Sequence, residues 1–250
     1  FLVKCGLMLA RRHPGVDDLS GHGHLTCLKP PMLIRNATLP DGRTGIDLLA
    51  RDEVADQASP RLRAVRRGDG LVVGEGACTL VLEDREHALA RGAMIHAEIV
   101  GFGTNSDGAH ATQPTSATMA RCIEMALADA ALPATAIGYV SAHGTATDRG
   151  DIAESQATSQ VMGTSMPISS MKSYLGHTLG ACGSIEAWWG IEMMKRGSFA
   201  PTLNLVDTDP ACGELDYIKG EDRAIETEHI LSNNFAFGGI NTSLVFRRIR

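Results

Sequence analysis

Three short segments of the sequence combine histidine, lysine, hydroxyl and glycine residues in a pattern that could support chemistry. Segment 141–147 contains His143 followed by a glycine and two threonines, Lys172 stands five residues before His177, and 233–239 reads Asn-Asn-Phe-Ala-Phe-Gly-Gly. Histidine is the side chain best suited to proton transfer near pH 7, and glycine lets backbone N–H groups approach a ligand. A single loop histidine is more often structural, but two of them near a lysine predict a site for acid–base or electrostatic catalysis.

Each segment follows a stretch with the residue pattern of a β-strand, and the strands alternate with helices. The sequence predicts strands at 95–103, 137–142, 167–169, 230–233 and 242–248, helices at 85–91, 115–130, 151–162 and 180–195, and two strand pieces joined by a bend over 71–82. Alternating strands and helices predict a layered α/β domain. In such a domain, polar loops at strand ends are where sites are built.

The composition excludes several classes of protein. Of the 250 residues, 44% are apolar, which is ample for a packed core. The formal net charge of −6 argues against a dedicated nucleic-acid binder. No apolar run approaches the ~18 residues that a membrane helix needs. None of the six cysteines forms a C-x-x-C pair, which favours a reducing, cytoplasmic setting over a disulfide scaffold.

The chain divides into two unequal parts near residue 67. Residues 1–67 hold 11 Lys/Arg against 7 Asp/Glu, five of the ten prolines and a single aromatic residue, whereas residues 68–250 hold 12 Lys/Arg against 22 Asp/Glu. A segment poor in aromatics and rich in proline buries little surface, so residues 1–67 are expected to be largely irregular. The first residue is Phe1, which suggests a piece of a longer protein.

Several other groupings favour simpler explanations than a site. Cys5, His22, His24 and Cys27 are zinc-type ligands, but their spacing is not that of a zinc finger, and a glycine-flanked loop is the preferred interpretation. The Gly-Phe-Gly-Thr-Asn-Ser run at 101–106 lacks the third glycine of a dinucleotide fingerprint, and Gly-Thr-Ser at 163–165 is not a P-loop. By residue type alone, Phe235 and Phe237 are best interpreted as core.

Taken together, the motifs from Asp69 to Arg250 resemble the C-terminal half of β-ketoacyl-acyl-carrier-protein synthases, the condensing enzymes of fatty-acid and polyketide synthesis. The shared segments are Gly70-Leu-Val-Val-Gly-Glu-Gly-Ala77, 97–105, 139–150, 172–183, Pro201-Thr-Leu-Asn204 and the Asn-Phe-Ala-Phe-Gly-Gly turn. The resemblance implies the thiolase-type fold, in which two similar α/β halves pack in α-β-α-β-α layers. It also implies three segments: 1–67 outside the family pattern, 68–93 the tail of the first half, and 94–250 the second half.

The resemblance implies a role for each polar residue of these motifs. His143 and His177 would be the catalytic histidines that bind the malonyl thioester carbonyl and promote decarboxylation, and Lys172 would orient the second histidine. Asp151 and Glu154 match acidic positions expected to hold Lys172, and Glu186 matches a buried structural acid. Thr145 and Thr147 would bind the pantetheine arm, and Phe237 would be the gate whose N–H contributes to the oxyanion hole. No metal or organic cofactor is implied.

The family's nucleophilic cysteine has no recognisable counterpart. It lies roughly 140 residues before the first catalytic histidine, which corresponds to the start of this chain. Cys5 is near that point, but its context Val-Lys-Cys-Gly-Leu lacks the small hydroxyl residues of the family, and Cys27 fits less well. The segment 61–67 likewise replaces the family's Arg-Pro-Phe-Asp-type sequence. The nucleophile is therefore unassigned.

Three functional hypotheses remain open from the sequence. The first is a condensing β-ketoacyl-ACP synthase, whose partners would be acyl carrier protein and a second ketosynthase subunit in a homodimer or heterodimer. The second is a non-condensing protein, either a partner subunit of the chain-length-factor type or a malonyl-ACP decarboxylase. The third is an inactive fragment, for which exposed apolar surface and weak stability are expected because the other half is missing.

Overall fold

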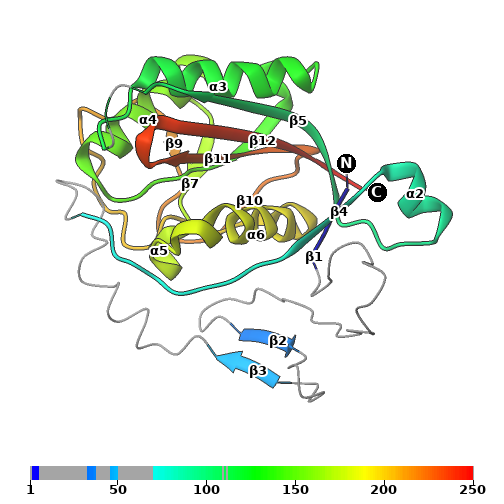
Figure 1. Ribbon diagram of the computed structural model, residues 1–250. Helices are drawn as coiled ribbons and strands as arrows, with labels where there is room; N and C mark the ends of the chain where they lie inside the picture. The colour runs from blue at the N-terminus through cyan, green and yellow to red at the C-terminus, as the bar shows by residue number, and fades with distance from the viewer. Residues whose placement is uncertain are drawn as a thin grey trace.

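The computed structural model describes residues 70–108, 110 and 112–249 in full, together with three short strands nearer the N-terminus (Figure 1). The strands are β1 (Leu2–Cys5), β2 (Leu33–Ala37), β3 (Ile46–Leu49), β4 (Leu80–Glu83), β5 (Ala97–Ser106), β6 (Ile137–Ser141), β7 (Pro167–Ser169), β8 (Ser198–Phe199), β9 (Asp216–Tyr217), β10 (Arg223–Ala224), β11 (His229–Ala236) and β12 (Ile240–Arg248). The α-helices are α2 (Arg85–Ala90), α3 (Ser116–Asp129), α4 (Asp148–Met162), α5 (Lys172–Leu175) and α6 (Cys182–Arg196).

One mixed sheet organises the molecule. Its strand order is β4-β1-β5-β12-β11-β6-β7-β9. Strands β11, β6, β7 and β9 run parallel, whereas β4, β1, β5, β12 and β11 pair antiparallel with their neighbours. Because parallel strands end at the same edge, the loops that follow β6, β7 and β11 meet there.

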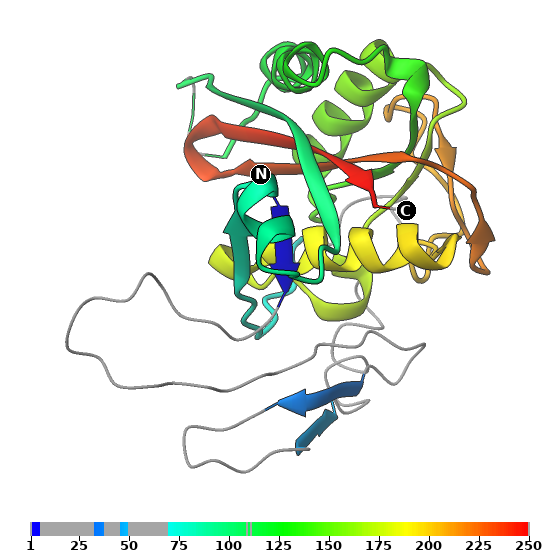
Figure 2. The ribbon, with the colours of Figure 1, turned by 90° about the vertical axis from the view of Figure 1, so that its right-hand side faces the viewer.

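Helices cover both faces of the sheet. In Figures 1 and 2, α3 and α4 lie on one face and α6 lies on the other. Successive residues of the central strands alternate between the two cores: Val140 and Leu231 pack with α3 and α4, whereas Tyr139 and Ile230 pack with α6. Since side chains alternate across a strand, a sheet buried on both faces needs apolar residues at consecutive positions, as in these strands.

Glycines in β5 allow α3 to lie directly on the sheet. A Cβ added at Gly101 would lie 2.3 Å from the carbonyl oxygen of Ala126, and one at Gly103 would lie 2.2 Å from that of Cys122. Any side chain at these positions would push α3 away. Gly101 and Gly103, which do not form a dinucleotide-binding fingerprint, therefore allow α3 to pack closely on the sheet.

Most predicted elements are confirmed within a few residues, and the mixed α/β class is confirmed with them. The prediction of two strand pieces over 71–82 is wrong in its first half, because only β4 forms there and Val73 makes a single isolated bridge to His177. The four-residue helix α5 was not expected. No helix among the residues described is long and apolar enough to cross a membrane.

Candidate active site

The three segments singled out in the sequence come together at one edge of the sheet. His143 lies two residues beyond β6, Lys172 begins α5 three residues beyond β7, and Phe237 begins the turn after β11. These three strands are neighbours and run parallel, so their carboxyl ends share one edge. The structure thus places residues that are far apart in sequence around one site.

The two histidine rings lie side by side in a perpendicular arrangement. Their centroids are 5.3 Å apart and their planes meet at 88°. Nδ1 of His177 accepts a hydrogen bond from the N–H of Leu179 at 3.0 Å, and Nδ1 of His143 lies 3.2 Å from Nζ of Lys172, which can only donate. In each neutral ring the proton therefore resides on Nε2, and the site holds two Nε2–H donors.

Both histidines are held in the neutral form. Burial, followed by the positive charge of Lys172 and by that of His177 when this ring is protonated, lowers the pKa of His143 well below its usual value of 6.5. Burial, followed by Lys172, also lowers the pKa of His177. Desolvation disfavours the charged imidazolium, so at neutral pH both rings are hydrogen-bond donors without a positive charge.

Lys172 contacts the first histidine, which differs from the expectation that it orients the second. Its ammonium donates to the backbone oxygen of His143 at 2.6 Å, to Nδ1 of His143, and to the carboxylate of Glu186. These contacts use its three donors. The reason is geometric: Lys172 is the first residue of α5, and its side chain reaches the loop of His143 rather than that of His177.

The acids of α4 hydrogen-bond to the backbone of the His143 loop, and their interaction with Lys172 is through charge rather than through a hydrogen bond. The two carboxylate oxygens of Glu154 accept the N–H groups of His143 and Gly144 at 2.8 and 2.7 Å. Asp151 accepts the N–H of Thr145 at 2.9 Å. These acids lie in the first two turns of α4, which faces the loop that precedes it. Burial raises the pKa of Glu154, and burial together with the charge of Glu154 raises that of Asp151 to about 7.

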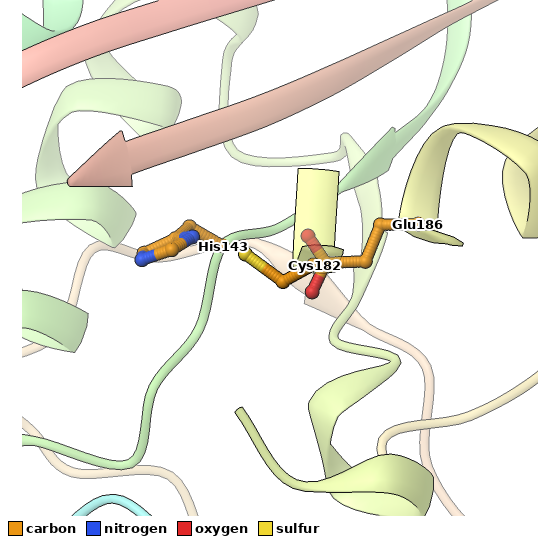
Figure 3. A group of neighbouring side chains, drawn as sticks. All are labelled: His143, Cys182 and Glu186. Carbon is orange, nitrogen blue, oxygen red and sulfur yellow. The ribbon is translucent and has the colours of Figure 1, made fainter. Parts of the chain in front are cut away.

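Glu186 is the acid that pairs with Lys172. Its side chain is buried, as expected, and burial raises its pKa to about 7 against the opposing effect of Lys172. The second carboxylate oxygen has no hydrogen-bond partner among the described residues. Possible metal-ligand atoms of His143, Cys182 and Glu186 all lie within 4.8 Å of one another (Figure 3). The Lys172 ammonium, which donates to both His143 and Glu186, already places a positive charge at this group.

A cavity of about 760 Å³ opens in front of the histidines. Its walls include both histidines and the predicted pantetheine and gate residues Thr145, Thr147 and Phe237. The two threonine hydroxyls lie 2.9 Å apart and share a hydrogen bond. Phe237 is 59% exposed, so its interpretation as core is wrong, whereas Phe235 is buried and its ring centroid lies 6.5 Å from that of His143.

A segment that sequence analysis did not connect with the site holds His177 in place. Residues 70–76, called the strap below, run beside the loop of His177. The N–H of His177 donates to Val72 at 2.7 Å, and Gly74 donates back to the His177 carbonyl at 3.0 Å. The N–H of Gly70 donates to Ala146 at 3.1 Å, so the strap also contacts the first loop. In the sequence, the glycines of this segment predicted a bend and did not indicate hydrogen bonds to the His177 loop.

The proposed positions for a nucleophile and a zinc site fall mostly outside the described residues. Cys5 is the last residue of β1, where it pairs with Leu80 of β4. Cys27, His22 and His24 lie outside the described residues, as do most of residues 1–67 apart from β1, β2 and β3. Cys182 is a further thiol of the site, which lies beside His143 and lines the cavity.

Comparison with known proteins identifies relatives of the second part of the chain. Residues 96–206 match the β-ketoacyl synthase C-terminal domain. The 3-oxoacyl-[acyl-carrier-protein] synthase 2 of Vibrio harveyi is 42% identical over 187 residues, which cover 72% of this chain and 45% of that protein. The chain therefore spans about half the length of the relatives it matches.

Solved structures agree with this assignment. A β-ketoacyl synthase from Burkholderia phymatum STM815 is 71% identical with a TM-score of 0.74, over 76% of this chain and 47% of that one. A type II polyketide ketosynthase, solved in complex with its acyl-carrier protein, is 37% identical with a TM-score of 0.72, over 78% and 48% of the two chains. The expected ketosynthase fold is thus confirmed. Residues 96–206 of the chain therefore form a C-terminal domain of the β-ketoacyl synthase family.

Proposed function

We propose that the whole protein is a β-ketoacyl-ACP synthase, an acyltransferase that condenses malonyl-ACP with an acyl thioester. The observation that carries the proposal is the pair of buried, neutral histidines, each with Nδ1 occupied as an acceptor and Nε2 carrying the proton. Two fixed N–H donors are what an enolate oxygen needs as its charge develops. They act without a proton transfer and without a metal ligand set.

The chemistry of the first step follows from these donors. The malonyl thioester carbonyl would bind against Nε2–H of His143 and His177. As the bond to the carboxylate breaks, CO₂ leaves and its bonding electrons move into the enolate, whose oxygen the two N–H groups stabilise. Lys172 and Glu154 hold His143 from its ring, its carbonyl and its N–H. Positioning of this kind lowers the reorganisation needed in the transition state.

The second step requires an acyl group on a cysteine. The enolate carbon would attack that thioester, form the new carbon–carbon bond and release the cysteine thiolate, giving β-ketoacyl-ACP. Dividing the condensation into two transfers is the role of covalent catalysis. The nucleophile remains unassigned in this chain. We place residues 1–67 outside the recognisable pattern, 68–93 in the tail of the first half and 94–250 in the second half.

Acyl carrier protein is the proposed partner. Thr145 and Thr147 in the cavity wall suit the amide and hydroxyl groups of a pantetheine arm, and the exposed Phe237 at the same cavity suits a gate. The related ketosynthase solved with its acyl-carrier protein supports this assignment. A homodimer, or a heterodimer with another ketosynthase, and a cytoplasmic location complete the proposal.

Release of CO₂ from malonyl-ACP by the 250-residue chain tests the first step. His143→Ala and His177→Ala are each expected to lower the rate at least about 100-fold, because each removes one donor to the enolate. His87→Ala is the control, since its side chain is 68% exposed in α2. Unchanged CO₂ release in both active-site variants would contradict the proposal.

Malonyl-ACP decarboxylation without condensation is the second candidate. It is favoured by the two neutral histidines, which suffice for the decarboxylation step. A chain-length-factor-like subunit would not need the two neutral imidazoles. Supplying acyl-ACP with malonyl-ACP separates the two activities: β-ketoacyl product means condensation, and acetyl-ACP with CO₂ but no such product means decarboxylation alone.

A further inference from the structure

The Pro201-Thr-Leu-Asn204 motif and Ser170 have no role in the proposed mechanism, yet hydrogen bonds join both of them to the loop 143–147, called the catalytic loop below. Ser170 directly follows β7 and stands two residues before Lys172. It is buried, with 8% of its surface exposed, and its hydroxyl donates to the carbonyl oxygen of Gly144 at 2.9 Å. Ser170 therefore connects the segment that follows β7 with the catalytic loop.

The backbone of the catalytic loop allows Ser170 to approach closely. Gly144 has a φ of 36°, and a Cβ added there would lie 2.7 Å from the Cβ of Ser170. A side chain at this position would therefore be strained and would collide with the serine. The N–H of Gly144 donates to Glu154 at 2.7 Å, while Lys172 holds the carbonyl of His143. The peptide groups on both sides of Gly144 are thus fixed by side chains, and Ser170 supplies the last of these contacts.

The 201–204 motif holds Ser170 in turn. Oγ1 of Thr202 accepts the N–H of Ser170 at 3.0 Å. Oγ of Ser173 accepts the N–H of Leu203 at 2.9 Å and donates to the carbonyl oxygen of Ser170 at 2.8 Å. The N–H, the carbonyl and the hydroxyl of Ser170 are therefore all engaged, and the backbone contacts direct the hydroxyl at the catalytic loop.

We propose that Ser170, held by Thr202, is a positioning residue: its hydroxyl fixes the Gly144 carbonyl and with it the direction of the Nε2–H of His143. The inference rests on the proposed function, in which this N–H donates to the enolate oxygen. Such a donor must lie within hydrogen-bond distance of the oxygen as its charge develops, and a displacement of about 1 Å can lower the rate about 100-fold. Ser170 acts through the Gly144 peptide and needs no contact with the substrate.

The kinetics of CO₂ release from malonyl-ACP by the 250-residue chain test the proposal in Ser170→Ala. We expect kcat to fall at least about ten-fold and KM to stay within about two-fold, because the variant frees the Gly144 carbonyl but keeps the groups that bind substrate. Ser155→Ala is the matched control: Ser155 is 6% exposed, and its hydroxyl also donates to a backbone carbonyl, that of Ile152 at 3.0 Å, outside the catalytic loop. A fall in kcat no larger than that of the control, or a rise in KM alone, would overturn the proposal.

Two substitutions of Thr202 test the contribution of the motif. Thr202→Val removes the acceptor for the N–H of Ser170 and is expected to lower kcat several-fold, whereas Thr202→Ser keeps the hydroxyl and should leave kcat nearly unchanged. Adding Thr202→Val to Ser170→Ala should cause little further loss, because both substitutions act through the same carbonyl. Losses that multiply in the double variant would show that Thr202 does not act through Ser170.

Amide hydrogen exchange separates this proposal from the proposed function. The N–H groups of Gly144 and Thr145 donate to the acids of α4, so their exchange reports opening of the catalytic loop without any substrate. Ser170→Ala should speed the exchange of both amides at least about ten-fold relative to Ser155→Ala, and equal exchange in the two variants would overturn the proposal. Faster exchange in a chain whose unmodified form releases no CO₂ would contradict the proposed function but not the support of the loop by Ser170.

Discussion

The buried pair of Lys172 and Glu186 is the residue-scale feature on which the geometry of the site depends. Both side chains are almost fully buried, and the lysine also donates to two atoms of His143. An ion pair of this kind adds little net stability as a pair, but removing one partner leaves a charge without compensation. Its main contribution is to fix His143, through Nδ1, in the tautomer that carries its proton on Nε2.

Lys172→Met is therefore expected to lower the free energy of unfolding by about 3–5 kcal/mol, because the Glu186 carboxylate loses its counter-charge. Adding Glu186→Gln to that variant should recover part of the loss. Urea unfolding measures both. Lys195→Met is the matched control, since Lys195 pairs with Glu192 at 2.7 Å with its own side chain 38% exposed, and Arg196 leaves Glu192 a second cationic partner, so the loss is expected to be about 1 kcal/mol or less. Equal losses in the two lysine variants would contradict the prediction.

Asp151 makes stability depend on pH. Its pKa is about 7 in the fold against an ordinary value near 3.8, so between these values the folded chain binds a proton that the unfolded chain has lost. The stability that this proton provides is complete below pH 3.8 and is lost as the pH rises toward 7. Asp151→Asn keeps an acceptor for the N–H of Thr145 and removes the charge of this half-buried carboxylate.

We expect Asp151→Asn to raise the free energy of unfolding by about 2–4 kcal/mol at pH 8 and to change it little at pH 3.5. Urea unfolding at the two pH values gives the comparison. Asp148→Asn, an exposed position in the same helix, controls for the loss of one negative charge. A gain at pH 3.5 as large as that at pH 8 would refute the assignment of a raised pKa.

At the scale of elements, the strap determines where His177 lies. It pairs with the loop on both sides of His177 and can do so only because Gly74 has no side chain: a Cβ there would lie 1.9 Å from the carbonyl oxygen of Leu175. The three loops of the site extend from the sheet edge, and the strap crosses two of them. A segment far from the histidines in sequence thus completes their support.

Gly74→Ala should separate the strap from the loop and displace His177. We expect malonyl-ACP decarboxylation to fall by at least about ten-fold and the free energy of unfolding by about 1–3 kcal/mol. Gly180→Ala is the control for stability, because a Cβ at Gly180 meets open space and its φ is not positive. Activity of Gly74→Ala equal to that of the unmodified chain would show that the strap does not position His177.

At the scale of the whole molecule, apolar side chains remain exposed around the site. Val73 is 64% exposed on the strap, and Leu179 and Phe237 are 50% and 59% exposed at the cavity. Relatives of this chain are about twice as long as the region it shares with them. Exposed apolar groups that gather in one place are typical of a surface covered by a partner.

The chain is expected to bind the dye 8-anilinonaphthalene-1-sulfonate. The first half of the Vibrio harveyi synthase can be made as a separate polypeptide. We expect this polypeptide to form a 1:1 complex with the chain and so to lower the emission of the dye. Val73→Lys should weaken this complex about ten-fold, because a charge would be buried at the contact. Val206→Lys is the matched control, since Val206 is 76% exposed but lies outside the strap. Size-exclusion chromatography and dye titration measure both effects, and equal weakening by the two variants would contradict the prediction.

The sequence by itself determined the elements and the place of the site. Apolar periodicity is local information, so β6, β7, β11, α3 and α4 could be predicted within a few residues of their bounds. The resemblance of the motifs to β-ketoacyl synthases also implied that His143 and His177 belong to one site. The contact between the strap and the His177 loop was not predicted, because it depends on backbone hydrogen bonds between segments about 100 residues apart.

Only the tertiary structure decided which polar groups contact one another. Lys172 pairs with Glu186 and touches His143, whereas Asp151 and Glu154 hold backbone N–H groups, and Cys182 lies beside His143. Spacing along the chain does not reveal how far α4 and α6 are rotated about their axes or how closely each approaches the sheet edge. A change of one residue in rotation turns a buried acid by about 100°, so the partner of each charge is fixed by helix packing on the two faces of the sheet.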